Sequence, residues 1–188
     1  MGANIDTIQT RILTEHTERR GLSANTLMTR IGDNLHCTGS NKEIIEVFSE
    51  YGVEFILVGG LAVSWYCADR QADDMDLLVN PTIENSGRIA RALSRLRYTF
   101  TDPQSFCFPG LQVPLKHIHY AELLTPHIDG PNFAALAKQA ILGKVLGIPV
   151  LVAAAQSLIE LKKLAIASDQ AMAKKHLQDI ECLLPYAA

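Results

Sequence analysis

The run FILVGG at residues 55–60 and the run DMDLLV at residues 74–79 decide the fold of this chain. The first opens with four consecutive apolar residues, which is typical of a short strand buried on both faces. The second places Asp74 and Asp76 two positions apart at the start of another apolar run. Because successive side chains of a strand point to opposite faces, we expect both carboxylates on the same face.

Two carboxylates on one face need a partner, since burying them as bare anions is costly. Water, a basic side chain or a divalent cation would satisfy them, and oxygen ligands suit Mg²⁺, which also binds substrate phosphates. Gly59 and Gly60 add the complementary feature. Residues without a Cβ atom let backbone N–H groups come close to a phosphate at a strand-to-helix turn.

A third acid, Glu122, lies in the apolar end of a run that predicts a strand over residues 115–124. If this strand lies beside that of Asp74 and Asp76, three carboxylates can hold two Mg²⁺ ions. Such a site suits an in-line attack on a nucleoside triphosphate, in which one metal activates the attacking oxygen and the other steadies the leaving pyrophosphate. Glu122, or Asp74 through the metal, would help to remove the hydroxyl proton.

Helices and strands alternate along the rest of the chain, which predicts an α/β (α+β) fold with a small mixed sheet of about four to five strands. We expect an N-terminal helical extension over residues 1–39 and a main domain over residues 40–188 that ends in helices. Ser40 and Glu43 have the spacing of a capping box at the start of a helix. The other expected elements are a helix over 82–96 capped by Thr82, a strand within 98–108, a helix over 132–140, a strand over 149–153 and a helical region over 157–184 with a break near 168–169.

Length and composition exclude several classes of protein. The chain has 188 residues, 48% of them hydrophobic and 20% charged, which fits one domain with a sizeable core. It has no apolar run of membrane-spanning length and no signal-peptide pattern, so we expect a cytoplasmic location and no membrane. The formal charge of −3 argues against a protein that coats nucleic acid. A partial helix-turn-helix pattern lacks its recognition helix, so we expect no sequence-specific DNA binding.

The four cysteines are far apart in the sequence and have no metal-site spacing. We interpret them as free thiols in a reducing compartment, although the sequence leaves a disulfide open.

The diglycine, the thirteen residues after it and the Asp-hydrophobic-Asp run resemble the signature of the polymerase-beta-like nucleotidyltransferase superfamily. Residues 70–79 (RQADDMDLLV) resemble the R-x-T-x-D-h-D-L-h-h run of the AbiEii-like nucleotidyltransferase toxins and their uncharacterised relatives. Residues 121–125 (AELLT) match the place of that group's third acid. Residues 158–162 (LIELK) and 175–180 (KHLQDI) match its late pattern, L-I-x-h-K followed by K-D-x-x-D-I.

The resemblance implies a nucleotidyltransferase-like domain in residues 40–188. Its activity would be Mg²⁺-dependent transfer of a nucleoside monophosphate from a triphosphate such as ATP to an acceptor hydroxyl. Asp74, Asp76 and Glu122 would be the metal-binding and catalytic acids. Gly59 and Gly60 would bind phosphates, Lys162 would face the triphosphate as the family's late lysine does, and Arg70 is a weaker candidate for the same task.

The resemblance also implies an RNA acceptor, such as the end of a transfer RNA, in a toxin–antitoxin setting with an antitoxin protein as partner. Other members of the superfamily modify small molecules such as antibiotics. Three residues depart from the family pattern: Ala72 replaces Thr, Glu122 replaces Asp and His176 replaces an acid. These departures keep open a non-catalytic relative that retains the scaffold and acts as a binding or partner protein.

Ordinary structural roles stay open for the same residues. They are a solvated strand end for Asp74 and Asp76, a surface or salt-bridged acid for Glu122, a tight turn for Gly59 and Gly60, pairing with Asp73 for Arg70, and a solvated helix face for Lys162.

Two other groups of side chains carry weaker hypotheses. His117 and His119 share a strand face, as zinc ligands can, but no third ligand is near in the sequence. Arg88, Arg91 and Arg95 recur at helical spacing and form a basic stripe that would contact a nucleic-acid backbone or simply face solvent.

Overall fold

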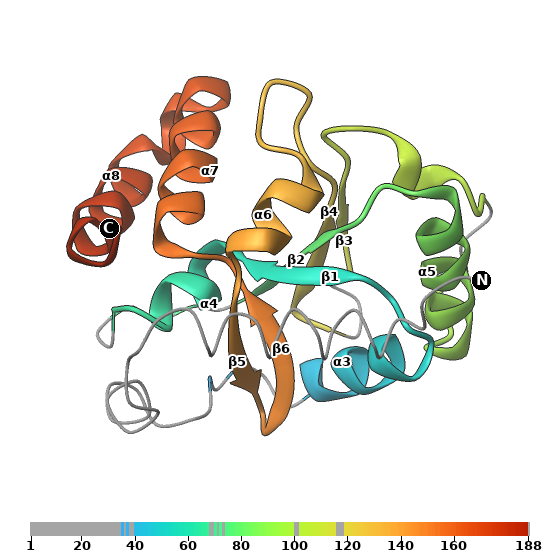
Figure 1. Ribbon diagram of the computed structural model, residues 1–188. Coiled ribbons are helices and arrows are strands. Elements are labelled where there is room, and N and C mark those ends of the chain that lie inside the picture. The colour runs from blue at the N-terminus through green and yellow to red at the C-terminus, as the bar shows by residue number, and fades with distance from the viewer. Residues whose placement is uncertain are drawn as a thin grey trace.

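The computed structural model describes residues 35, 37, 40–67, 70, 72, 74–99, 102–115 and 119–187, which form a mixed six-stranded sheet flanked by helices (Figure 1). The strand order across the sheet is β3-β4-β2-β1-β6-β5. The strands are β1 (Phe55–Val58), β2 (Met75–Val79), β3 (Gln112–Pro114), β4 (Ala121–Leu124), β5 (Ile141–Val145) and β6 (Ile148–Val152).

The helices lie around this sheet, with α5 at one end of the molecule and α7 and α8 side by side at the other (Figure 1). Both α7 and α8 also pack on α4. The α-helices are α3 (Asn41–Glu50), α4 (Gly59–Ser64), α5 (Ile83–Arg95), α6 (Phe133–Gln139), α7 (Ala155–Ser168) and α8 (Ala173–Leu183), and the 3₁₀ helices are η1 (Ser105–Cys107), η2 (Gln170–Met172) and η3 (Leu184–Tyr186).

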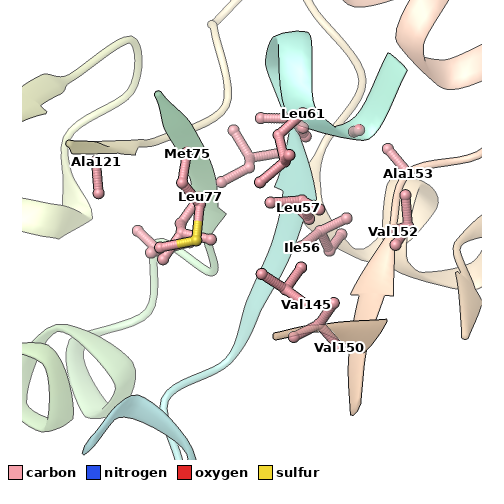
Figure 2. Close-up of a cluster of buried hydrophobic side chains, with 14 of the residues drawn as sticks. Ile56, Leu57, Leu61, Met75, Leu77, Ala121, Val145, Val150, Val152 and Ala153 are labelled. Atoms are coloured by element: carbon pink, nitrogen blue, oxygen red, sulfur yellow. The ribbon is translucent and has the colours of Figure 1, made fainter. Parts of the chain in front are cut away.

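The two central strands confirm the prediction from the apolar runs. β1 and β2 pair antiparallel, with Leu57 opposite Leu77. On their outer sides, β6 pairs parallel with β1 and β4 pairs parallel with β2. Ile56, Leu57, Met75 and Leu77 are fully buried in the core around these strands (Figure 2). Since each such side chain contributes roughly 1.5–3 kcal/mol when buried, this cluster fixes where the sheet forms.

The sheet has more strands than the four or five expected, because the sequence analysis predicted β6 but missed β5, its hairpin partner, and the edge strand β3. β5 and β6 pair antiparallel with Val145 opposite Ile148, so only Leu146 and Gly147 form the turn. Both turn residues have positive φ, 49° and 83°. Such two-residue turns are normally signalled by Asn-Gly or Asp-Gly, and Leu is an unusual residue for this conformation.

The region between α5 and β4 also differs from the prediction. The strand expected within residues 98–108 is wrong, because the regular element that the structure describes there is the 3₁₀ helix η1. Of the strand expected over 115–124, the described residues are extended as β4 only from Ala121. The strand that pairs with β4 at the sheet edge is β3, which lies before the predicted range.

The structure confirms one predicted helix cap and contradicts another. Thr82 caps α5 as predicted, and its side chain accepts a hydrogen bond from the Asn85 backbone N–H. Ser40, in contrast, has helical φ and ψ and makes no side-chain cap, so the predicted capping box is wrong. The next residue acts instead: the buried amide of Asn41 donates to the Tyr120 carbonyl (2.9 Å) and accepts from the Tyr120 N–H (3.0 Å). It joins α3 to the residue directly before β4.

The expectation of four free thiols is wrong. Cys67 and Cys182 form a disulfide across a Cα–Cα distance of 6.3 Å, whereas Cys37 and Cys107 are free. The two bonded residues are 115 positions apart in the chain. They meet only because α8 packs on α4, which sequence spacing does not reveal.

Most of the predicted N-terminal extension lies outside the described residues, as does the partial helix-turn-helix pattern. From that region, Leu35 forms an isolated parallel bridge with Val145 at the edge of β5. Among the described residues, no helix combines the length and apolar character needed to cross a bilayer.

A buried polar network joins α5 to the central strands. The Asn85 side chain is fully buried, accepts from the Glu54 N–H (2.8 Å) and donates to the carbonyls of Glu54 (3.0 Å) and Asn80 (2.9 Å). Arg88 donates to the Glu54 carboxylate (3.0 Å) and to the carbonyl of Gly52. The first arginine of the predicted basic stripe therefore has a structural role.

We expect Asn85→Ala to lower the free energy of unfolding by about 1–3 kcal/mol, because it leaves the Glu54 N–H without a partner and removes one of the hydrogen bonds to each of the Glu54 and Asn80 carbonyls. Urea denaturation measures this change. Glu84→Ala is the matched control, since Glu84 is the exposed neighbour on the same helix, and it should change stability by less than about 0.5 kcal/mol. Equal effects of the two substitutions would contradict the prediction.

Candidate active site at the diglycine end of the sheet

The structure places Asp76 and Glu122 side by side. Their strands β2 and β4 pair parallel in a register that sets Asp76 opposite Glu122 and, on its other side, opposite Val58. Directly opposed residues share a face of the sheet, so the two carboxylates are neighbours. The prediction that the Glu122 strand lies beside that of Asp76 is confirmed, and Asp74 directly precedes β2 with a half-buried side chain.

Glu122 is 7% exposed, which excludes the alternative of an exposed surface acid. Its Oε2 atom accepts a hydrogen bond of 2.5 Å from Nε2 of Gln112 on the edge strand β3. Sequence analysis missed Gln112 because β3 itself was not predicted. This amide helps to hold an anionic oxygen in a site with little water around it.

The diglycine lies against the acid pair. Gly59 has a φ of +67°, and a Cβ atom there would lie 1.7 Å from Oδ2 of Asp76, so only glycine fits. A Cβ atom on Gly60 would lie 3.0 Å from Nη2 of Arg70 and 3.3 Å from Cβ of Ala72. The diglycine backbone therefore contacts a carboxylate at one residue and a guanidinium at the next.

The two predicted phosphate-neutralising cations meet at an acid that the sequence analysis did not select. Asp179 on α8 is 2% exposed, and its carboxylate lies 2.6 Å from Arg70 Nε and 2.7 Å from Lys162 Nζ. Lys162 itself is 8% exposed, so the solvated-face alternative is wrong. Asp73, the other partner considered for Arg70, lies outside the described residues. The sequence did carry a signal for Asp179, because it stands at the second acid of the late pattern K-D-x-x-D-I.

Charge and burial set the protonation of this cluster. Burial by itself raises the pKa of the Asp179 carboxyl, but hydrogen bonds from Arg70 and Lys162 and their positive charges outweigh it and lower the pKa. The pKa of His176 is lowered, first by burial and then by the charge of Lys162. Near neutral pH the cluster thus combines an ionised acid, two cations and a neutral imidazole.

A pocket of about 440 Å³ opens beside these cations, between α4 and α8. Among the residues that line it are Cys67, Arg70, Lys175, Asp179 and Cys182. Arg70 therefore reaches from the diglycine into a cavity whose wall contains the disulfide.

The acids fit a magnesium site in their chemistry. Asp76 and Glu122 offer hard carboxylate oxygens on one face, which are the ligands that Mg²⁺ prefers, and Asp74 lies two residues before Asp76, just outside the strand. In the part of the chain that the structure describes, no cluster of three or more His, Cys, Asp or Glu side chains is arranged as metal ligands. Asp74 would have to turn toward the pair to complete the set.

The zinc hypothesis for the histidine pair gains no support. His119 is buried, with its Nδ1 atom 2.6 Å from the Tyr98 hydroxyl, and that hydroxyl also donates to the carbonyl of Leu115. His119 Nε2 lies 3.6 Å from a Glu43 carboxylate oxygen. His117 lies outside the described residues. His119 thus belongs to a packing cluster between α3 and the start of β4.

Solved structures share this fold. A crystal structure of ANT(2'')-Ia in complex with adenylyl-2''-tobramycin superimposes with a TM-score of 0.53 and 14% identity, covering 79% of this chain and 87% of the other. A solution structure of the antibiotic-resistance factor ANT(2'')-Ia superimposes with a TM-score of 0.53 and 15% identity, covering 79% of this chain and 83% of the other. A crystal structure of an antigenic nucleotidyltransferase-like protein from Paracoccidioides brasiliensis has a TM-score of 0.47 and 13% identity, covering 78% of this chain and 75% of the other.

The likeness to the two ANT(2'')-Ia structures shows that the chain has a nucleotidyltransferase fold, as the sequence predicted. The sequence matches no family model and no curated protein.

We expect Gly59→Ala to lower the free energy of unfolding by about 1–3 kcal/mol, because the new side chain is strained at positive φ and displaces Asp76. Gly87→Ala is the control. Gly87 lies within α5, where a Cβ atom would make an ordinary 3.7 Å contact with Arg91, so this change should be neutral or stabilising by up to about 1 kcal/mol. Both values come from urea denaturation, and a neutral Gly59→Ala would contradict the described contact.

Asp179→Asn should lower the free energy of unfolding by about 3 kcal/mol near neutral pH, because it removes the buried carboxylate that Arg70 and Lys162 both contact. A carboxyl whose pKa is lowered by folding adds stability above its unfolded pKa and loses it as the pH falls through the folded value. The difference between wild type and variant should therefore narrow below the ordinary value of 3.8. Urea denaturation across the acid range checks this, and a constant difference would be the contrary result.

Proposed function

We propose that this protein transfers a nucleoside monophosphate from a nucleoside triphosphate to an acceptor hydroxyl, with pyrophosphate leaving. One observation carries the proposal: Asp76 lies beside Glu122 in the sheet and directly on Gly59. Metal-binding oxygens and a backbone that a phosphate can approach thus occur at one place. The shared fold supports the proposal without establishing the activity.

The chain's own residues would divide the work as follows. Asp74, Asp76 and Glu122 would hold Mg²⁺, which when bound supplies positive charge to the phosphates and favours ionisation of the attacking hydroxyl. Gln112 keeps the Glu122 carboxylate in place. Because Gly59 has no Cβ atom, the Asp76 carboxylate that would hold the metal lies directly against the diglycine turn at which the phosphates would bind.

Arg70 and Lys162 would neutralise the phosphates, and Asp179 would keep both cations in position. Its carboxylate contacts both side chains, so neither has to be ordered from solvent when a nucleotide binds. Asp179 contacts no substrate in this scheme and acts as a positioning residue. The family pattern has an acid where this chain has His176. Because His176 is neutral, it does not offset the positive charge of Lys162 as that acid would.

The sharpest test is calorimetric titration of ATP, CTP, GTP and UTP, with and without Mg²⁺, into the wild type and into Asp74→Asn/Asp76→Asn. We expect Mg²⁺-dependent binding of at least one triphosphate to the wild type and its loss in the variant, because the variant lacks two of the anionic metal ligands. Asp76→Asn alone should slow nucleotide transfer by roughly two orders of magnitude.

Glu160→Gln is the matched control, since it removes an exposed acid from α7 without touching the site. It should bind as the wild type does. Binding that is unchanged in the double variant would refute the assigned metal ligands. Binding of no triphosphate at all would instead favour a non-catalytic protein that keeps the scaffold.

The acceptor divides the proposal into two cases. The motif resemblance favours RNA, including the end of a transfer RNA, with an antitoxin protein as regulator. The solved complex of ANT(2'')-Ia with adenylyl-2''-tobramycin makes a small polyhydroxylated molecule the second candidate. Incubation with labelled triphosphates and either transfer RNA or tobramycin distinguishes them by which acceptor becomes labelled.

A further inference from the structure

The disulfide and the buried ion pair connect the same two segments. Cys67 and Arg70 belong to one turn, closed by a 3.0 Å hydrogen bond from the Arg70 N–H to the Cys67 carbonyl. Asp179 and Cys182 are three positions apart on α8, so they lie on one face of that helix. The disulfide Cys67–Cys182 therefore runs beside the ion pair of Arg70 with Asp179.

We infer that Cys67 and Cys182 form a redox-sensitive switch that sets the affinity of the nucleotide site, an inference that rests on the proposed function. With the bond formed, the turn that carries Arg70 is fixed to α8. Arg70 then stays at Gly60, and Asp179 stays between Arg70 and Lys162. The cations are thus ordered before a nucleotide arrives, which lowers the entropic cost of binding.

The bond is placed where a small thiol can reach it. Both cysteines line the 440 Å³ pocket, and Cys182 is exposed although Cys67 is buried. A low-molecular-weight thiolate would attack the sulfur of Cys182, release Cys67 as a thiol and form a mixed disulfide. A second thiol equivalent would then free Cys182, leaving two protein thiols and one oxidised small disulfide. The reverse exchange with such a disulfide restores the bond.

Reduction breaks the disulfide and leaves the ion pair of Arg70 with Asp179 in place. In the reduced protein, the segment that carries Arg70 and helix α8 are held together only by their packing and by the ion pair, so Arg70 is less strictly positioned. Part of the free energy of nucleotide binding is then used to order Arg70. We expect the dissociation constant for Mg²⁺–ATP to rise roughly tenfold on reduction.

The experiment uses the full chain in oxidised and reduced form. Maleimide labelling of the denatured protein, counted by intact mass, should modify two cysteines before reduction and all four after it. Calorimetry with Mg²⁺–ATP then measures the affinity of both forms. If another triphosphate binds better in the earlier titration, that one replaces ATP.

Two variants complete the design. Cys67→Ser/Cys182→Ser should bind like the reduced wild type and ignore reductant, whereas Cys37→Ser/Cys107→Ser should keep the full response. If the first variant fails to fold, the reduced wild type supplies the same comparison. Four reactive thiols before reduction, or equal affinity in both forms, would overturn the switch while leaving the proposed function intact. Binding in neither form would overturn the proposed function, and the switch with it.

Discussion

The pairing of β2 with its two neighbours is the constraint on which the rest of the structure depends. β2 runs antiparallel to β1 and parallel to β4, so the start of β2 meets both the end of β1 and the start of β4. One register therefore brings Asp76 to Gly59 and to Glu122 at once. A shift by one residue would turn the acids to the opposite face, where Met75 and Leu77 fill the core.

The C-terminal helices add the positive charge to this acidic end. α7 carries Lys162 and α8 carries Asp179, and the carboxylate of Asp179 binds Lys162 and Arg70 together. An acid buried in this way is stable only with its cations, and the lowered pKa of Asp179 reflects that dependence. The disulfide reinforces the same contact. The position of α8 is thus coupled to the positions of the Arg70 and Lys162 cations.

Prediction from sequence succeeded where a local pattern carried the information. The strands at Phe55–Val58 and Met75–Val79, the Thr82 cap and the helices before and after the break near Asp169 follow from apolar runs and end signals. It failed where the signal was absent or misleading. Leu146-Gly147 is an atypical hairpin turn, and Ser40 has the spacing of a capping box but makes no cap, while the Asn41 amide bonds to Tyr120 instead.

The sequence by itself determined the two central strands, the diglycine and the spacing of Asp74 and Asp76, because each depends on residues close together in the chain. Only the tertiary structure decided which distant groups meet. Gln112 on the edge strand β3 donates a hydrogen bond to Glu122, and Asp179 joins Arg70 to Lys162. Cys67 bonds to Cys182, which is 115 positions away in the chain. These contacts arise from how helices pack on the sheet, and packing depends on the whole buried surface rather than on local spacing.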